Sequence, residues 1–189
     1  EVLYDFLTAY DREITAEKHR RGICDFTDNR RNLLRLLCNP DGSPSSVAAE
    51  YRESFDEVYI DEYQDVDAVQ DAIFRLIGGN RRFMVGDIKQ SIYAFRGADP
   101  SVFAGYRRAL PPLDLSAQTD GASEDNGGRS IFMSDNFRCD EPVIRVTNGI
   151  CGHLFRACPD DSIGYRAEDD LGFSKRVPAG YVSPRVQID

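Results

Sequence analysis

The spacing of apolar residues changes along this chain and separates a helical beginning from a mixed middle. Through residue 54 the apolar positions recur every three or four residues, as on one face of an amphipathic helix. Residues that favour N-caps precede two of these patterns, and an Asn-Pro-Asp-Gly run is a stop signal. Helices are therefore predicted at 1–21, from Thr27 or Asp28 to the stop at 39–42, and from Ser45 or Ser46 to about Ser54.

Beyond residue 54 short apolar runs alternate with helical spacing. Residues 57–60 and 82–85 have the composition of strands, and 66–77 between them has a helical apolar face that closes at 78–80. A further helix is predicted at 101–109. Strand, helix and strand joined by short connections are typical of a parallel α/β sheet.

The last part of the chain gives weaker patterns. Residues 111–129 are rich in Pro, Ser, Gly and Asp and are predicted to form a mobile loop. A strand is expected at 130–134, followed by a helix with Asp140 as its cap and a proline in its first turn. The tail from 159 is irregular, with a terminal strand at 185–188.

Composition and charge narrow the class of protein. With 189 residues, 41% of them hydrophobic, the chain can bury about one core. No run reaches the roughly 18 apolar residues of a membrane span. A net charge of −9 argues against a general binder of phosphate backbones but leaves room for a local DNA track.

The cysteines form no CxxC pair, which favours free thiols over zinc ligands or disulfides. A reducing, cytoplasmic location is therefore expected. The residues concerned are Cys24, Cys38, Cys139, Cys151 and Cys158.

Two adjacent carboxylates, Asp61 and Glu62, follow the strand predicted at 57–60. Phosphoryl transfer needs a divalent ion to neutralise phosphates and a carboxylate to orient or deprotonate water. Neighbouring acids at a strand end can divide these tasks, Asp61 toward Mg²⁺ and Glu62 toward the water. An isolated Asp-Glu pair is more often a solvated turn, but the preceding apolar run and the following Gln64-Asp65 strengthen the signal.

A second strand end, Gly86-Asp87, leads into residues 88–100. Gln90 is placed to sense a γ-phosphate through its side-chain amide. Tyr93, Phe95 and Arg96 lie within four residues of one another, and aromatics beside an arginine can stack on unpaired bases. On composition alone, an equal alternative is that the aromatics are core residues and the arginine is a surface charge.

A third candidate is Asn136-Phe137-Arg138. An arginine just past a strand suits an arginine finger that reaches a γ-phosphate across a cleft. Such residues are more often partners in surface ion pairs.

In this order and spacing the chain resembles the UvrD-type superfamily 1 DNA helicases, most strongly over about 23–157. IDEYQD at 60–65 is similar to their second motif, the Walker B acids, VGDIKQSIYAFRGA at 85–98 to their third and NFR at 136–138 to their fourth. Lys89, the continuation ADPSVF and the upstream CDFTD resemble the AddA/RecB-like branch, which includes ATP-dependent helicase–nuclease subunits.

The resemblance implies roles for individual residues, with ATP and Mg²⁺ as cofactors. Asp61 would bind Mg²⁺ and Glu62 would activate water. Gln90 would contact the γ-phosphate and link it to the DNA track. The remaining roles concern DNA and nucleotide contacts: Tyr93 and Phe95 would stack on bases supported by Arg96, Phe137 would lie against adenine, and Arg138 would be the finger.

The sequence departs from the family pattern at three points. Phe95 stands where many relatives have Trp, and stacking should survive this change. Cys139 stands where Ser is usual after NFR. The chain contains no GxxxxGK[ST] phosphate loop and no Gly-Lys dipeptide, so the backbone cradle for the phosphates is missing from it.

The implied fold is α/β, a partial RecA-like P-loop NTPase domain with a parallel sheet and a helical segment from an inserted subdomain. The parent would process double-strand DNA ends with an AddB-like partner subunit, and the fragment alone is expected to be inactive. The expected divisions are 1–54 in the inserted subdomain, 55–110 in the first RecA-like domain, the loop 111–129, the fourth-motif segment 130–158, and 159–189 at the start of the second RecA-like domain.

Two other classes of function remain open. The chain could be a non-catalytic, helicase-like module that binds a partner or a DNA end. A metal-dependent nuclease is the third hypothesis, but it leaves the pattern from Gln90 to Arg96 unexplained. Its metal ligands would be Asp61, Glu62, Asp65 and Asp87.

Overall fold

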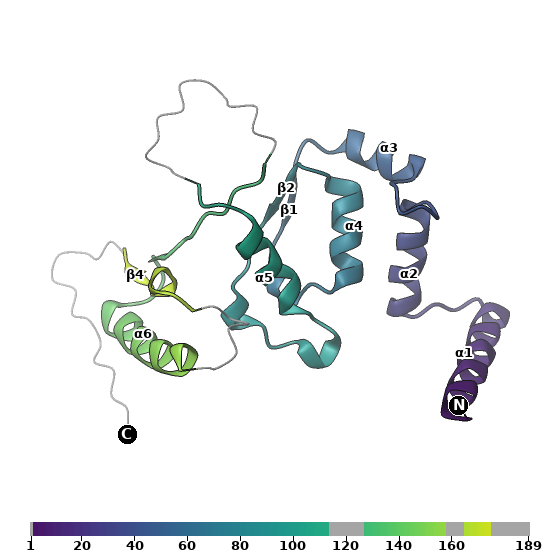
Figure 1. Ribbon diagram of the computed structural model, residues 1–189, viewed down its shortest axis with the longest axis horizontal. Helices are drawn as coiled ribbons and strands as arrows, with labels where there is room; N and C mark the ends of the chain where they lie inside the picture. The colour runs from purple at the N-terminus through teal and green to yellow at the C-terminus, as the bar shows by residue number, and fades with distance from the viewer. Residues whose placement is uncertain (1, 114–126, 158–164, 175–189) are drawn as a thin grey trace. The chain divides into compact units, whose positions relative to one another are not determined.

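The computed structural model describes residues 2–113, 127–157 and 165–174 (Figure 1). The chain forms two compact units. Unit 1 consists of the chain up to Asp61 together with Asp67–Val85, and unit 2 consists of Glu62–Val66 together with the chain from Gly86 onward. Within the described residues no helix is long and apolar enough to cross a membrane.

Unit 1 combines helices with a small parallel sheet, as the strand–helix–strand pattern predicts. Strands β1 and β2 pair in parallel, with Val58 opposite Arg82 and Ile60 opposite Met84. Helix α4 makes the connection between them (Figure 1). The elements of unit 1 are α1 (Val2–Arg21), α2 (Phe26–Leu37), α3 (Ser46–Ser54), β1 (Val58–Ile60), α4 (Ala68–Gly78) and β2 (Arg82–Met84).

The core of unit 1 lies between α2, α3 and α4. It is built on Leu37, Ala48, Ile73 and Leu76, which are 1%, 0%, 7% and 8% exposed. These residues lie on the apolar faces that the three- and four-residue spacing predicts. Burial of such faces stabilises the unit through the hydrophobic effect, at about 25 cal/mol per Å² of apolar surface.

Helix α1 contrasts with this core, because none of its described residues is buried. Its end is fixed by Lys18, whose Nζ lies 2.7 Å from the carboxylates of both Asp25 and Asp28. These two hydrogen bonds raise the pKa of Lys18 to about 12. An ion-pair cluster therefore joins α1 to the beginning of α2.

The helix starts show where local patterns mislead. Helix α2 is capped by Asp25, not by Thr27 or Asp28: the Asp28 N–H donates to Asp25 Oδ1 and the Asp25 N–H donates to Asp28 Oδ2. This reciprocal capping box satisfies two backbone donors, which makes the earlier start more stable. Ser45 caps α3, one of the two predicted alternatives.

Helix α4 begins at Ala68, two residues later than predicted, because Asp67 forms a capping box with Gln70. The Arg30 guanidinium also binds the Asp67 carboxylate. The residues just before this cap form a 3₁₀ turn, η1 (Tyr63–Asp65), which belongs to unit 2.

Unit 2 is built from short elements. Helix α5 packs on η1 and η2, and α6 packs on β4. The elements of unit 2 after η1 are η2 (Ile88–Gln90), η3 (Ala94–Arg96), α5 (Pro100–Ala109), β3 (Asp135–Asn136), α6 (Glu141–Arg156), η4 (Ala167–Asp169) and β4 (Gly172–Phe173).

The strand predicted at 130–134 is wrong. Within that segment Ser130 makes an isolated bridge with Pro112, and the strand itself, β3, is Asp135–Asn136, paired in parallel with β4. Met133 is 71% exposed, so the apolar run is not a buried strand. Most of the predicted loop at 111–129 and the whole strand at 185–188 lie outside the described residues.

Candidate functional site

The ends of the two parallel strands place the first acid of the motif. The Val85 N–H donates to the Ile60 carbonyl at 2.8 Å, which extends the pairing of β1 and β2 to their C-terminal ends. Asp61 follows Ile60 directly and is exposed. Since parallel strands end at one edge of a sheet, Asp61 lies where α/β proteins bind ligands.

The donor set suits a magnesium nucleotide in part. Mg²⁺ keeps several waters and usually takes one or two protein carboxylates besides phosphate oxygens. An exposed Asp61 provides such a carboxylate. The residues present therefore fit the metal half of the site, while the phosphate cradle is not in this sequence.

Glu62 has an unusual backbone. Its φ of 53° and ψ of 41° lie in the left-handed region, and among the described residues no other non-glycine has a positive φ. This conformation costs about 1–3 kcal/mol and is concentrated at functional sites. It turns the chain so that Glu62 stays exposed while Tyr63 and Gln64 are 0% and 1% exposed.

The packing of Tyr63 explains how this strain is supported. Its ring lies 5.7 Å from that of Phe103 and 5.9 Å, edge-on, from that of Tyr106. Both partners come from α5. An aromatic cluster of this kind contributes about 0.5–1.5 kcal/mol per pair beyond the burial of its area. It fixes η1 on α5 and so fixes the backbone on either side of Gln64.

Gln64 connects the two acidic motifs. Its Nε2 donates to Glu62 Oε2 at 2.6 Å, and its Oε1 accepts from the Asp87 N–H at 2.9 Å. The Ser91 hydroxyl donates to the Gln64 backbone carbonyl at 3.3 Å. The side chain thus has partners at both ends, as a buried amide requires.

Gly86 leaves the space that this contact needs. A Cβ at this position would lie 2.7 Å from Gln64 Oε1 and 2.9 Å from the Phe103 ring. Both distances are shorter than non-bonded carbon contacts allow. The glycine of the third motif is therefore a packing requirement of the Gln64–Asp87 hydrogen bond.

Asp87 distributes this connection to the residues that follow it. Its Oδ2 accepts from Gln90 Nε2 at 3.0 Å, and its Oδ1 lies 2.8 Å from Lys89 Nζ. A continuous path of hydrogen bonds therefore runs from Glu62 through Gln64 and Asp87 to Gln90. The residues of this path, which we call the motif relay, all belong to unit 2.

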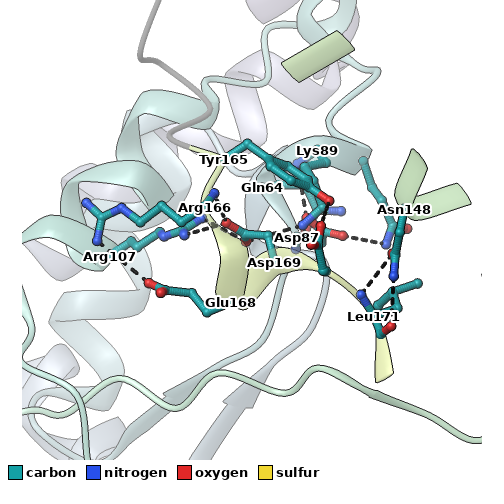
Figure 2. Close-up of polar contacts among 12 residues, drawn as sticks. Gln64, Asp87, Lys89, Arg107, Asn148, Tyr165, Arg166, Glu168, Asp169 and Leu171 are labelled. Atoms are coloured by element: carbon teal, nitrogen blue, oxygen red, sulfur yellow. Dashed lines mark hydrogen bonds and ion pairs between the residues drawn. The ribbon is translucent and has the colours of Figure 1, made fainter. Parts of the chain in front are cut away.

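A further carboxylate joins the motif relay from a distant part of the chain. Asp169 accepts from Arg107 Nη2 at 2.8 Å and from Lys89 Nζ at 3.4 Å (Figure 2). Its side chain is 7% exposed. Burial alone raises the pKa of Asp169, but the bonds from Arg107 and from the Arg166 N–H, with the charges of Arg107 and Lys89, bring that pKa below its usual value.

The predicted base-stacking residues form an exposed group. Phe95 is 79% exposed and Tyr93 is 37% exposed, so neither is a buried core residue. The Arg96 guanidinium lies 4.9 Å from the Tyr93 ring centre and 5.5 Å from that of Phe95. Cation–π contacts of this kind order the two rings and leave aromatic surface accessible.

Phe137 and Arg138 lie at the turn before α6. The Asn136 side-chain oxygen accepts from the N–H groups of Arg138 and Cys139, at 3.0 and 2.8 Å. This asparagine turn explains the local need for Asn in the motif. Phe137 is 68% exposed and Arg138 is exposed, so both side chains are accessible at this turn.

The sequence indicated part of this arrangement. The structure brings Glu62 and Gln90 into one hydrogen-bonded path. Sequence reasoning noted Gln64 without assigning its bridging role and missed Asp169 entirely. Asp169 had no local signal, because its segment has neither strand nor helix periodicity.

The metal-nuclease hypothesis gains no support from this geometry. Among the described residues, no group of three or more His, Cys, Asp or Glu side chains is arranged to hold a metal ion. Asp65 Oδ1 is buried and is the one such side-chain atom, in the described part of the chain, without a hydrogen-bond partner.

A hollow of about 400 Å³ lies in unit 1 around the end of α4. Its arginines have structural partners: Arg52 donates to the carbonyls of Arg75 and Leu76, and Arg81 donates to those of Arg52 and Phe55. They satisfy carbonyls that helix ends leave unpaired. The lining consists of Arg52, Arg75, Gly78, Gly79, Asn80, Arg81 and Arg82.

Comparison with known proteins gives a consistent result. Residues 1–111 match the family model described as the UvrD/REP helicase N-terminal domain. The chain is 42% identical over 170 residues to proteins of Staphylococcus aureus strains JH9, JH1 and NCTC 8325 that are named as the larger-lettered "A" member of an ATP-dependent helicase/nuclease. The match covers 86% of this chain, which spans 12% of the length of each of these relatives.

Proposed function

Because this chain belongs to the UvrD/REP helicase family, we propose that it is the part of an ATP-dependent DNA helicase that links nucleotide hydrolysis to movement on single-stranded DNA. The observation that carries this proposal is the motif relay from Glu62 to Gln90. It connects a carboxylate suited to water activation with an amide suited to a γ-phosphate, inside one compact unit.

At the nucleotide end, Asp61 is the metal ligand and Glu62 orients and deprotonates the attacking water. Gln90 donates its amide to the γ-phosphate, in exchange for or in addition to its bond with Asp87. When bound with ATP, Mg²⁺ neutralises phosphate charge. The exposed Phe137 packs against adenine and Arg138 acts as the arginine finger.

At the DNA end, Tyr93 and Phe95 stack on unpaired bases and Arg96 supports both rings. The exposed aromatic surface and the guanidinium between the rings support this assignment. Stacking of this kind contributes about 1–3 kcal/mol per base and tolerates any sequence. Tyr93 follows Gln90 closely along the chain, so a displacement of Gln90 is transmitted to the aromatic pair.

The whole protein is proposed to be an AddA-like helicase–nuclease subunit that acts on double-strand breaks with an AddB-like partner. In it, residues 55–110 form the C-terminal part of a RecA-like domain and 1–54 form part of an inserted helical subdomain. The phosphate loop and the second RecA-like domain are supplied by other parts of the longer protein. The name of the relatives, a helicase/nuclease subunit, supports this proposal.

The decisive experiment replaces Glu62 in the whole protein. We expect Glu62→Gln to lower DNA-stimulated ATP turnover roughly 10²- to 10⁴-fold, the usual contribution of a general base, while nucleotide binding is retained. Glu57→Gln is the matched control, since Glu57 is an exposed acid beside β1 that has no role in the relay. Normal turnover in Glu62→Gln would rule out the proposed role.

The isolated chain is expected to have no substantial ATPase activity. DNA-stimulated turnover by the chain alone, abolished by Glu62→Gln, would contradict this expectation. If the whole protein binds DNA ends but does not hydrolyse ATP, the alternative of a helicase-like interaction module replaces the enzyme.

A further inference from the structure

We propose that Asp169 is a positioning residue of the motif relay, which holds Lys89 and thereby sets the orientation of Asp87 toward Gln90. This inference rests on the proposed function, because the relay has a catalytic meaning only if Gln90 senses nucleotide. It assigns a role to a segment that lies beyond the fourth motif and outside the motifs themselves.

The segment that carries Asp169 is fixed on α6. Asn148 Nδ2 donates to the Leu171 carbonyl and Asn148 Oδ1 accepts from the Leu171 N–H, both at 2.9 Å (Figure 2). Asp170 accepts from Arg156 at 2.9 Å and from the Tyr165 hydroxyl at 2.6 Å. Asp169 is therefore held by the helix that begins directly after Asn136-Phe137-Arg138.

The same segment is also tied to the strand that carries the fourth motif. Strand β4 pairs with β3, and the Gly172 N–H donates to the Ser134 carbonyl at 2.8 Å. Asp169 thus moves with the turn that presents Phe137 and Arg138. Through Lys89, 80 residues earlier in the chain, it contacts the third motif.

Charge explains why this contact orients the relay. Lys89 lies between two carboxylates, 2.8 Å from Asp87 and 3.4 Å from Asp169, and its side chain is 19% exposed. Arg107 lies on the other side of Asp169 at 2.8 Å. The four charges alternate in sign, so Lys89 Nζ is held on the Oδ1 side of Asp87 while Oδ2 remains available to Gln90.

Removal of the Asp169 charge would leave two cations beside one another with Asp87 as the only carboxylate of the set. Lys89 would then be free to rotate about Asp87, because its second anchor is lost. The Gln90 amide would lose its fixed orientation, although Gln64 would still hold the Asp87 backbone. The expected defect is therefore in turnover and not in nucleotide affinity.

The test uses the whole protein with Asp169→Asn. We expect kcat for DNA-stimulated ATP hydrolysis to fall roughly 10- to 100-fold, as for other displaced catalytic groups, with KM for ATP unchanged within about twofold. Glu141→Gln is the matched control, because it removes one carboxylate from an exposed ion pair with Arg145 in the same unit. That variant should retain normal turnover.

Lys89→Met breaks the same link from its other end and leaves the pair between Asp169 and Arg107 in place. It therefore tests the proposal even if Asp169→Asn does not fold. We expect Lys89→Met to reproduce the loss of kcat, and the double variant to lose no more than either single variant. Additive losses would show that Asp169 acts only on stability and would overturn the proposal.

A chemical measurement tests the contact independently of activity. The Lys89 amine should react with an acylating reagent faster in Asp169→Asn than in the unsubstituted protein, with Lys18 as the internal reference in the same digest. An unchanged rate would overturn the proposal. An unsubstituted protein that does not hydrolyse ATP would refute the proposed function itself, whereas normal turnover in Asp169→Asn would refute the positioning role alone.

Discussion

The two units of this chain are stabilised by different kinds of interaction. In unit 1 the helices α2, α3 and α4 enclose an apolar core of small and branched side chains, of which Leu37 is 1% exposed. In unit 2 the most buried groups include an amide, Gln64, which is 1% exposed, and a carboxylate, Asp169, whose side chain is 7% exposed. The first unit relies on non-directional burial and the second on directional bonds.

This difference separates scaffold from candidate machinery. Apolar contacts tolerate small shifts, whereas a hydrogen bond fails when its donor and acceptor move by a fraction of an ångström or rotate. A relay built from such bonds can have discrete arrangements, which a coupling element between nucleotide and DNA requires. The left-handed Glu62 stands at the chain boundary between the two units.

The largest effect on stability is expected in the apolar core. Leu37→Ala should destabilise unit 1 by about 2–5 kcal/mol, because it removes a fully buried side chain and leaves a cavity. Hydrogen exchange followed by mass spectrometry should show faster exchange in α2, α3 and α4 than in α5. Leu36→Ala is the control, since Leu36 is 54% exposed. Equal acceleration in α5 would mean that the two units unfold together.

A smaller but more local effect is expected at Gly86. Gly86→Ala should cost about 1–3 kcal/mol through overpacking, because the new Cβ meets Gln64 Oε1 at 2.7 Å. Exchange should accelerate around η1 and η2 and remain normal in α2. Gly105→Ala, at a helical site with open space around it, is the matched control and should be neutral or stabilising. If both variants behave alike, the Gln64–Asp87 contact is not formed.

The third prediction concerns the cap of α3. Ser45→Ala should cost about 1 kcal/mol, because the Ser45 hydroxyl accepts from the Ala48 N–H at the helix start. Ser46→Ala is its control, since Ser46 lies inside the helix. Thermal unfolding of the two variants measures the difference. A larger loss for Ser46→Ala would reverse the assignment of the cap.

The smallest effect near neutral pH is expected from acid. The pKa of Asp169 lies below its usual value, so its contribution to stability is fully present above the unfolded pKa of about 3.9 and is lost as pH falls through the lower folded pKa. Exchange of residues 165–171 should therefore be constant between about pH 5 and 8, once corrected for the intrinsic rate, and rise in stronger acid. Asp169→Asn should flatten this dependence, and an unchanged profile in that variant would assign the effect to other groups.

Local sequence patterns predicted unit 1 well. The apolar spacing identified α2, α3 and α4, and the strand–helix–strand order indicated the parallel pairing of β1 and β2 that the structure confirms. Errors there were confined to helix starts, such as Asp25 in place of Thr27 or Asp28 at α2. Competing caps two or three residues apart differ by about 1 kcal/mol, which a pattern does not resolve.

Unit 2 was predicted less well for a physical reason. Its strand β3 depends on β4, which lies beyond α6, and the apolar run at 130–134 misled the local interpretation. Pairing between distant segments leaves no period in either one. The motif residues were identified by their order along the chain, but the hydrogen bonds among them were not.

The sequence by itself determined the α/β class, the family and the residues of each motif, because these depend on residue types at short spacings. The tertiary structure decided that Gln64 bridges Glu62 and Asp87, and that Asp169 reaches Lys89 from 80 residues away. Contacts of that range form only when the whole chain folds, since the entropy of closing the loop is offset by many other contacts at once. They are therefore properties of the fold and not of any local pattern.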